Sequence, residues 1–237
     1  MFDFHGKITD RMLLSQGTSG FHPISFASPL FAPSSPHGWR HAVKRCVDVA
    51  LALAALTICS GLLLAIWFMV RIDSKGAAVF RQRRIGHDGQ AFEVLKFRTM
   101  YQDTECEALR QATRDDPRVT RVGAWLRRTS FDELPQFINV LRGDMSVVGP
   151  RPHAPGTRAG GRLFEDVAIH YAERHRAKPG ITGLAQVRGW RGETDTEQKL
   201  LHRVASDLEY IETWSLRLDA MIILRTIPMV LRMFNAY

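Results

Sequence analysis

The longest apolar stretch of the chain covers residues 49–70 and contains no charged side chain. As a helix it would be about 33 Å long at 1.5 Å per residue, which is just enough to cross the hydrocarbon core of a bilayer. Basic residues lie on both sides of the stretch, within 40–45 and within 71–84. A straight transmembrane helix would place one of these basic flanks outside the cytoplasm, against the positive-inside rule.

Ser60 and Gly61 lie at the middle of this stretch, and a glycine beside a serine is one of the few causes of a sharp bend in a helix. Each leg of a bent helix would be about 16–18 Å long, near half of the hydrocarbon thickness. We therefore predict a helical hairpin over residues 39–72 that enters the membrane and returns to the same side. The alternatives are a straight span and a buried helix of a soluble domain.

The remaining pattern predicts an α+β domain, mostly helical, over residues 73–237. Segments 78–84 and 91–97 contain apolar and basic residues and flank an Asp88-Gly89 turn, which predicts a β-hairpin. Helices are predicted over 101–116, 122–128, 134–141, 163–176 and 199–237. The last has apolar and basic faces, so it could lie on the membrane surface or pack on the core. The glycine-rich residues 178–193 are predicted to form a connecting loop, with close approach of its backbone to a ligand as the alternative.

Residues 1–38 contain several prolines and serines without helical or strand periodicity, so we predict a flexible leader. The leader lacks the order of a basic start, an apolar middle and a small-residue cleavage site that defines a secretory signal. We therefore expect it to be retained.

An acidic pair, Asp132 and Glu133, comes just before the apolar stripe of the 134–141 helix. A purely structural explanation is available, because Ser130 and Glu133 have the spacing of a capping box, and Asp132 could serve as the cap instead. The sequence does not decide between these registers, since Pro135 fits only some of them. Either register would account for the two carboxylates without catalysis.

Arg151 lies between two prolines, which favour an extended and rigid backbone at this position. The guanidinium group fits phosphate oxygens, and a carboxylate can act as nucleophile, base or metal ligand. Together with the acidic pair, Arg151 indicates chemistry on a phosphate. Arg127 and Arg128 end the preceding helix, and we expect them to keep the two carboxylates ionised.

The net charge is +8 and the pI about 9.9, which favours anionic partners such as nucleic acid, anionic lipid or phosphorylated substrates. The basic residues are scattered, without a recognition helix or an aromatic-studded basic sheet, so we expect no nucleic acid partner. Cys46, Cys59 and Cys106 form no CxxC pair and are expected to be reduced thiols.

Read as ordered motifs, residues 44–226 resemble the bacterial sugar transferase family of monotopic polyprenyl-phosphate phosphoglycosyltransferases. The matching segments are 44–48, 73–76, 84–86, 96–100, 132–136, 142–146, 148–152, 178–183, and Asp207 with Tyr210. The resemblance implies a bacterial inner-membrane protein with its catalytic domain facing the cytoplasm. It implies transfer of a sugar-1-phosphate from a UDP-sugar to undecaprenyl phosphate, with release of UMP and a requirement for Mg²⁺.

The resemblance also implies roles for individual residues. Asp132 would be the nucleophile that forms an aspartyl-phosphosugar intermediate, and Glu133 would assist through Mg²⁺ or by proton handling. Phosphate or nucleotide binding is expected from Arg151, Arg127, Arg128, Lys96, Arg98 and Gln186. Asp207 and Arg203 are candidate supporting residues, and Asp132 and Glu133 are the candidate metal ligands. Membrane lipid is an expected partner, and a homodimer is compatible with the resemblance.

Residues 189–196 resemble those of members that transfer glucose-1-phosphate from UDP-glucose, with galactose-1-phosphate as the alternative. The chain resembles the short form of the family, without a multi-span membrane domain in front. It departs from the family pattern at Ser60-Gly61, where Ser-Pro is frequent, and at Arg188, where asparagine is frequent. A membrane-associated scaffold without activity is the non-enzymatic alternative.

Overall fold

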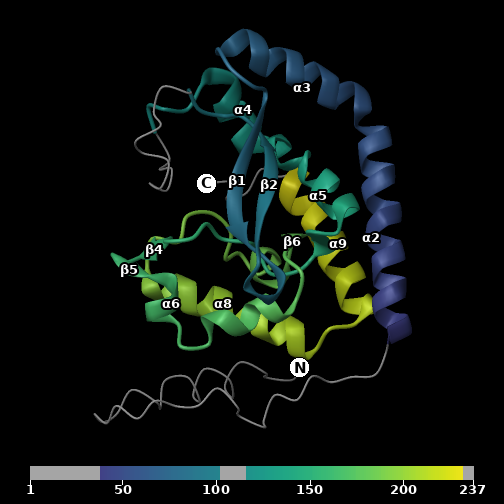
Figure 1. Cartoon of the computed structure of the whole chain (residues 1–237), viewed down its shortest axis with the longest axis vertical. Helices are drawn as coiled ribbons and strands as arrows, with labels where there is room; N and C mark the ends of the chain where they lie inside the picture. Colours follow the sequence, from purple (N-terminus) through teal and green to yellow (C-terminus); the bar gives the residue numbers. More distant parts are fainter. Residues whose placement is uncertain (1–37, 102–115, 232–237) are drawn as a thin grey trace. The chain divides into compact units, whose positions relative to one another are not determined.

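A computed structural model describes residues 38–101 and 116–231 of the chain (Figure 1). The predicted leader and most of the predicted 101–116 helix, with Cys106, lie outside these residues. The described part is mostly helical with three two-stranded sheets, which confirms the predicted α+β class.

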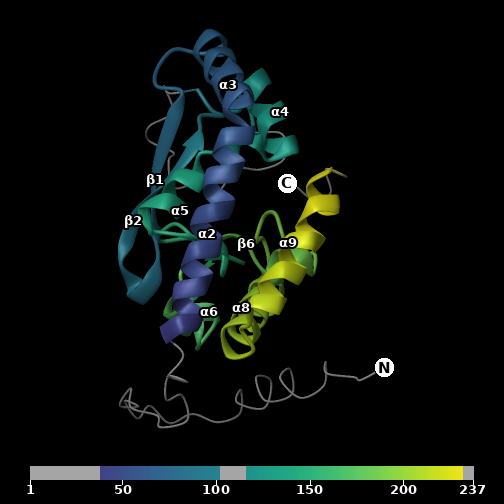
Figure 2. The same ribbon diagram turned by 90° about the vertical axis from the view of Figure 1, so that its right-hand side faces the viewer.

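The apolar stretch forms two helices, α2 (Gly38–Ile58) and α3 (Ser60–Asp73), which meet at Cys59 with a bend of 64°. The predicted bend is therefore confirmed at the predicted place (Figures 1 and 2). Among the described residues, no unbroken helix has the length and apolarity needed to cross a bilayer, whereas this bent pair passes the same criteria as a unit.

Strands β1 (Val79–Ile85) and β2 (Ala91–Phe97) form the predicted hairpin, paired antiparallel from Val79 opposite Phe97 to Ile85 opposite Ala91. The turn η2 (His87–Gly89) has Asp88 and Gly89 at positive φ, a conformation that glycine and aspartate tolerate. Val94 and Phe97 point into the core, so the hairpin is attached to the domain through β2.

The acidic pair follows α4 (Arg121–Thr129) and forms the 3₁₀ turn η4 (Phe131–Glu133), and α5 (Gln136–Arg142) begins only after Pro135. Ser130 ends α4 at φ 62° and precedes η4, but its side chain makes no capping hydrogen bond to η4, and α5 begins after Pro135. Both proposed caps are therefore wrong. Pro135 explains this outcome, since its ring is compatible with the start of α5 but not with a helix that begins at Ser130.

The glycine-rich segment contains strand β6 (Gly180–Thr182) and helix α7 (Leu184–Val187), so the prediction of a simple loop is wrong. Strand β6 pairs in parallel with β3 (Ser146–Val148). A Cβ atom added to Gly180 would lie 2.1 Å from the Gly149 nitrogen. The close backbone approach is therefore to another part of the same chain, and it packs the segment that precedes Arg151 against β6.

The predicted 163–176 helix is two short elements, α6 (Phe164–Val167) and η5 (Tyr171–Arg176), preceded by the small hairpin of β4 (Arg158–Ala159) and β5 (Arg162–Leu163). The predicted 199–237 helix is also divided, into α8 (Glu197–Glu212) and α9 (Leu216–Leu231). Residues 213–215 interrupt it, and there the Trp214 indole donates to Asp219 at 3.2 Å. Periodicity alone did not reveal these breaks, because the apolar residues keep a helical spacing across them.

Polar contacts attach the start of α2 to the domain. Lys44 donates to Asp219 of α9 at 2.8 Å and to the Val148 carbonyl at 3.2 Å. The buried Asp48 accepts from the Ser146 hydroxyl at 2.8 Å and from the Val147 amide at 3.0 Å. Helices α2 and α9 and strand β3 therefore share one polar junction beside the main hydrophobic core.

Candidate active site

The acidic pair faces a basic side chain from each of two neighbouring elements. Lys96 of β2 donates to a Glu133 oxygen at 2.9 Å. Arg151 donates to both Glu133 oxygens, through Nη1 at 3.1 Å and through Nη2. The structure therefore brings together three residues that the sequence placed in the site from separate segments.

Burial raises the pKa of the Glu133 carboxyl, but Arg151 and Lys96 outweigh it and hold that pKa well below its usual range. Burial also lowers the pKa of Lys96, although Glu133 opposes the change. The two groups form an ion pair at 2.9 Å, and each offsets part of the effect of burial on the other. Glu133 is thus an anion whose two oxygens are already engaged by cations.

Asp132 has different surroundings, although it is adjacent in sequence and only 8% exposed. Burial raises the pKa of Asp132 to about 6, with the Glu133 charge acting in the same direction and Lys96 and Arg127 opposing. Arg127 favours the ionised form of Asp132, in the expected direction, but burial outweighs it and the pKa is raised. No hydrogen bond between described residues involves its carboxylate, so its oxygens are available to another group.

Two further arginines fix the backbone of Arg151 and Pro152. Arg174 donates to the Arg151 carbonyl at 2.6 Å, and Arg84 donates to the Pro152 carbonyl at 3.0 Å. Burial and the charge of Arg151 lower the pKa of Arg84 to about 10, which leaves it a cation at neutral pH. These two contacts hold the segment after β3 so that the Arg151 side chain points at Glu133.

Arg191 also belongs to the site, and the sequence reasoning did not select it. Its guanidinium donates to the Ser130 hydroxyl, two residues before Asp132. Burial lowers the pKa of Arg191, while Glu133 raises it and Arg151 lowers it. The available signal in the sequence was its place in the glycine-rich 178–193 segment, where ligand approach was the alternative to a connecting loop.

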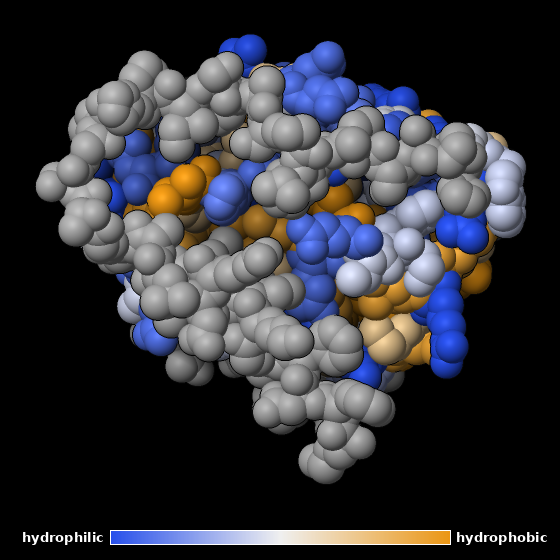
Figure 3. Space-filling model, turned by 90° about the horizontal axis from the view of Figure 1, so that it is seen from below, coloured by the Kyte–Doolittle hydropathy of each residue, from blue (hydrophilic) through white to orange (hydrophobic). Residues whose placement is uncertain are grey.

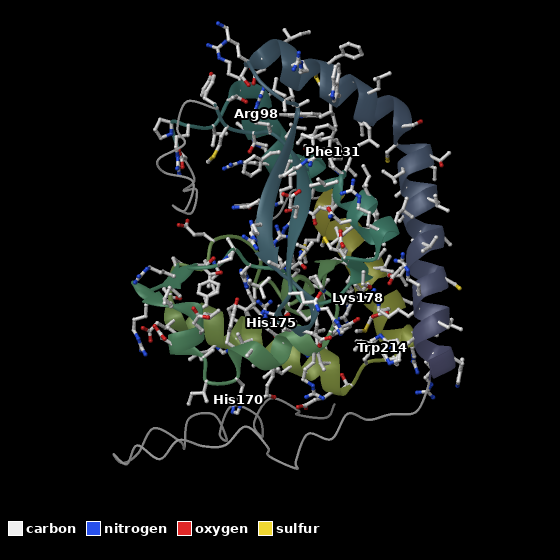
Figure 4. All side chains as sticks on the ribbon, in the orientation of Figure 1. Arg98, Phe131, His170, His175, Lys178 and Trp214 are labelled. Carbon is white, nitrogen blue, oxygen red and sulfur yellow. The ribbon has the colours of Figure 1, made fainter. Side chains whose placement is uncertain are left out.

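Other predicted site residues lie farther from the acidic pair. Arg127 acts on Asp132 through its charge but donates to Thr99 at 2.8 Å. Arg98 donates to Ser74 at the end of α3, at 2.6 Å to the carbonyl and 3.0 Å to the hydroxyl (Figure 4). Among the contacts of the described residues, none joins Arg128 to either carboxylate.

Gln186, Asp207 and Arg203 are buried but make no hydrogen bond to the acidic pair. Gln186 donates to the Ile181 carbonyl at 3.1 Å. Asp207 pairs with Arg174 at 2.6 Å, and Arg203 donates to the Trp190 carbonyl at 2.6 Å. Asp207 and Arg203 therefore reach the site only through other residues.

The residues present fit Mg²⁺ with few protein ligands. Among described side chains, no group of three His, Cys, Asp or Glu residues is arranged to hold a metal ion. Mg²⁺ is commonly bound through one or two carboxylates together with substrate phosphates. Asp132 has unoccupied oxygens for this purpose, whereas Glu133 would have to exchange a contact with Lys96 or Arg151.

The arginine and lysine side chains around the acidic pair are suited to binding phosphate groups. The chain belongs to the bacterial sugar transferase family, which it matches over residues 39–233.

Of three similar proteins, two have names that refer to glucose phosphate transfer and one is named for exopolysaccharide production. The undecaprenyl-phosphate glucose phosphotransferase of Komagataeibacter xylinus is 48% identical over 200 residues, which are 84% of this chain and 38% of the relative. The UDP-glucose:undecaprenyl-phosphate glucose-1-phosphate transferase of Caulobacter vibrioides is 48% identical over 194 residues, 82% of this chain and 72% of the relative. The exopolysaccharide production protein PSS of Rhizobium leguminosarum bv. phaseoli is 47% identical over 186 residues, 78% of this chain and 93% of the relative. The chain thus spans less than half of the first relative.

Proposed function

We propose that this chain transfers a hexose-1-phosphate from a UDP-sugar to undecaprenyl phosphate, through a covalent intermediate on Asp132. The observation that supports this most is the contrast within the acidic pair. Glu133 is neutralised by Lys96 and Arg151, whereas Asp132 is a buried carboxylate with a pKa of about 6 and no hydrogen bond from a described residue. At neutral pH such a carboxylate is mostly ionised yet poorly solvated, which favours its use as a nucleophile.

In the first step, an Asp132 oxygen attacks the phosphorus that carries the sugar. The bond between this phosphorus and the oxygen bridging to the second phosphate breaks, and UMP leaves with that oxygen. In the second step, an oxygen of undecaprenyl phosphate attacks the aspartyl phosphate. The bond to Asp132 breaks, which restores the carboxylate and gives the undecaprenyl-pyrophosphate sugar.

The cations around the pair would stabilise phosphate charge in both steps. Arg151 and Arg191 approach from two different loops, and preorganised cations of this kind contribute much of the rate in phosphoryl transfer. Mg²⁺, held by Asp132 and the substrate phosphates, would supply further neutralisation of phosphate charge. Glu133 keeps Lys96 and Arg151 in place, and its oxygens become ligands only if one of these contacts is released.

Glucose is the proposed sugar, because the Komagataeibacter and Caulobacter relatives are named for glucose transfer. UDP-galactose is the alternative donor.

We also propose that α2 and α3 form a re-entrant hairpin, with the site on the cytoplasmic face of the inner membrane. Large apolar side chains of these helices are exposed, including Leu53, Ile58, Leu64, Phe68 and Ile72. Burying such a surface in lipid is favourable.

The decisive experiment measures UMP release from UDP-glucose by detergent-solubilised full-length protein with Mg²⁺ and undecaprenyl phosphate. Asp132→Asn should abolish release, and Arg81→Gln is the matched control, because Arg81 forms only an exposed ion pair with Glu93. Equal release by parent and Asp132→Asn would remove Asp132 from its role. Release from UDP-galactose alone would change the sugar, and no release from any UDP-sugar would favour an inactive scaffold.

A further inference from the structure

Behind Arg151 and Arg191 lies a buried polar group that we name the α8 cluster: His153, Arg174, Arg203 and Asp207. These residues are 8%, 2%, 4% and 1% exposed, in that order. Burying two guanidinium groups beside one carboxylate is unfavourable unless nearly every donor finds a partner. The proposed reaction uses none of these four groups directly, so their burial calls for another explanation.

Arg203 binds the backbone on both sides of Arg191. Its Nε and Nη2 atoms donate to the Trp190 carbonyl at 3.0 and 2.6 Å. The Nη2 atom also donates to the Gly192 carbonyl at 3.0 Å. One guanidinium therefore fixes the carbonyls of the two residues next to Arg191, and Arg191 in turn contacts Ser130 beside the acidic pair.

Arg174, on the other side of the cluster, binds the backbone of Arg151. Its Nη2 atom donates to the Arg151 carbonyl at 2.6 Å. The Nε and Nη2 atoms also donate to Asp207 at 3.1 and 2.6 Å. Asp207 and Arg203 are four residues apart on α8, so they lie on one face of that helix. Arg151 and Arg191 are thus both held in place by contacts that lead to α8. Figure 1 shows this helix running below the β1–β2 hairpin.

His153 separates the two guanidinium groups. Its Nδ1 lies 2.5 Å from Arg174 Nη1, and its Nε2 lies 3.3 Å from Arg203 Nη1. Burial, Arg174 and Arg203 lower the pKa of His153 well below its usual range, so the ring is neutral. Both guanidinium groups are donors, so a neutral ring can accept from only one of them; the shorter contact makes Nδ1 the acceptor from Arg174, and Nε2 then makes no hydrogen bond with Arg203.

We propose that the α8 cluster is a positioning device that sets the distance between Arg151 and Arg191, with Arg174 acting on the first and Arg203 on the second. Two guanidinium groups fixed from separate loops suit the two adjacent phosphates of a nucleoside diphosphate. This inference rests on the proposed function, because it assigns these phosphates to the donor substrate. Arg203 and Arg174 are positioning residues, since they act through the backbone of residues that face the substrate.

The test is a double-mutant cycle in the full-length protein, with Arg203→Met, Arg191→Gln and the two together. Arg203→Met should lower kcat/KM for UMP release about 10- to 100-fold, since small misplacements of a positioned group have effects of this size. If Arg203 acts through Arg191, the double variant should be within about twofold of Arg191→Gln alone, because the effects of coupled residues do not add. Arg203→Lys should recover part of the activity, because an ammonium still donates to the carbonyls.

The matched control is Arg162→Met. Arg162 of β5 forms an exposed ion pair with Glu197 of α8 and makes no hydrogen bond to the site. Arg162→Met should therefore leave kcat/KM unchanged. Multiplied losses in the double variant would show that Arg203 acts independently of Arg191 and would overturn the proposal.

Hydrogen–deuterium exchange gives a second readout that does not require activity. Exchange of the backbone amides of residues 188–193 should become faster in Arg203→Met and remain as in the parent in Arg162→Met. Unchanged exchange in Arg203→Met would overturn the placement of Arg191 by Arg203. A parent that releases no UMP would contradict the proposed function, and the exchange result would still decide this placement.

Discussion

Asp132 shows how a single residue can be unfavourable for folding and useful for chemistry. Its pKa of about 6 means that the folded protein holds its carboxyl proton more tightly than the unfolded chain does. Ionising this group in the folded state therefore lowers the stability of the protein. Strain of this kind is common at functional sites.

Asp132→Asn should stabilise the protein at pH 7.5, by up to about 3 kcal/mol if the whole pKa shift is expressed. The gain should be full above pH 6 and should shrink as the pH falls toward 3.8, because the parent carboxyl is then protonated both in the folded and in the unfolded state. Thermal unfolding of the parent and Asp132→Asn in detergent, between pH 3.8 and 7.5, would measure this difference in stability. A variant that is less stable than the parent at pH 7.5 would contradict the assigned shift.

Lys96→Met should move the pH dependence of activity as well as its size. Lys96 opposes the burial that raises the pKa of Asp132, so its removal raises that pKa further, above 6. The acid limb of kcat/KM should therefore shift to higher pH, by about 1 unit. Activity at pH 6.5 should fall more than activity at pH 8.

The control for this variant is Arg81→Met, which removes a cation from the neighbouring strand β1. Arg81 is exposed and pairs with Glu93 at 3.8 Å, so the acid limb should stay in place. The same pH profile for Lys96→Met and the parent would mean that Lys96 does not act on Asp132.

At the scale of elements, the site depends on a close contact between two backbones. Strands β3 and β6 pair through Ser146 and Gly180, and Gly149 lies against Gly180 and Gly183. A Cβ atom on Gly183 would lie 2.4 Å from the Gly149 carbonyl oxygen. This contact fixes the segment that leads into Arg151, so a change in packing here should appear as a change in activity.

Gly180→Ala should destabilise the protein by about 2–4 kcal/mol, because its Cβ would overlap backbone atoms that cannot move aside. Thermal unfolding and UMP release should both decline. Gly61→Ala is the control, since a Cβ at Gly61 would have no heavy atom within 4 Å and alanine favours a helix. An unaltered unfolding temperature for Gly180→Ala would refute the tight contact.

The sequence predicted those elements whose pattern is local. The bend at Ser60 and the β1–β2 hairpin follow from short signals, namely a serine–glycine pair and an aspartate–glycine turn. The pairing of β3 with β6 could not be predicted in this way, because it joins residues far apart in the chain through glycines that have no side-chain pattern. The same holds for Arg191, which reaches the site through a fold that its neighbours in sequence do not specify.

For the acidic pair, the sequence identified the residues but not their conformation. Ser130 adopts a left-handed conformation between two helices, which a capping pattern does not reveal. The difference between Asp132 and Glu133 also escaped prediction, since it arises from Lys96 and Arg151, which come from other elements.

At the scale of the whole chain, polar and apolar surfaces are unevenly distributed. The end of the molecule viewed in Figure 3 shows hydrophilic and hydrophobic side chains interspersed wherever grey atoms do not cover it. Helix α3 instead exposes large apolar residues, among them Leu64 at 59% and Phe68 at 52%. This difference supports the proposal that α3 contacts lipid.

Phe68→Arg should weaken association with liposomes, because a charged residue within the hydrocarbon region costs roughly 2.5–3.5 kcal/mol. Flotation of the full-length protein with liposomes would measure the bound fraction. Ile169→Arg is the control, since Ile169 is 80% exposed but lies in a segment rich in charged residues. Equal losses for both variants would indicate that α3 has no special role in membrane binding.

The polar junction of α2 has a consequence for how the protein is made. Lys44 and Asp48 emerge from the ribosome well before their partners, since Ser146 follows Asp48 by 98 residues and Asp219 follows Lys44 by 175 residues. At roughly 5–20 residues per second, Lys44 waits about 10–35 s for Asp219. Ser146 is made about 5–20 s after Asp48, whereas Lys44 lacks Asp219 until α9 has been made. We therefore expect the start of α2 to stay in water until α9 has been made.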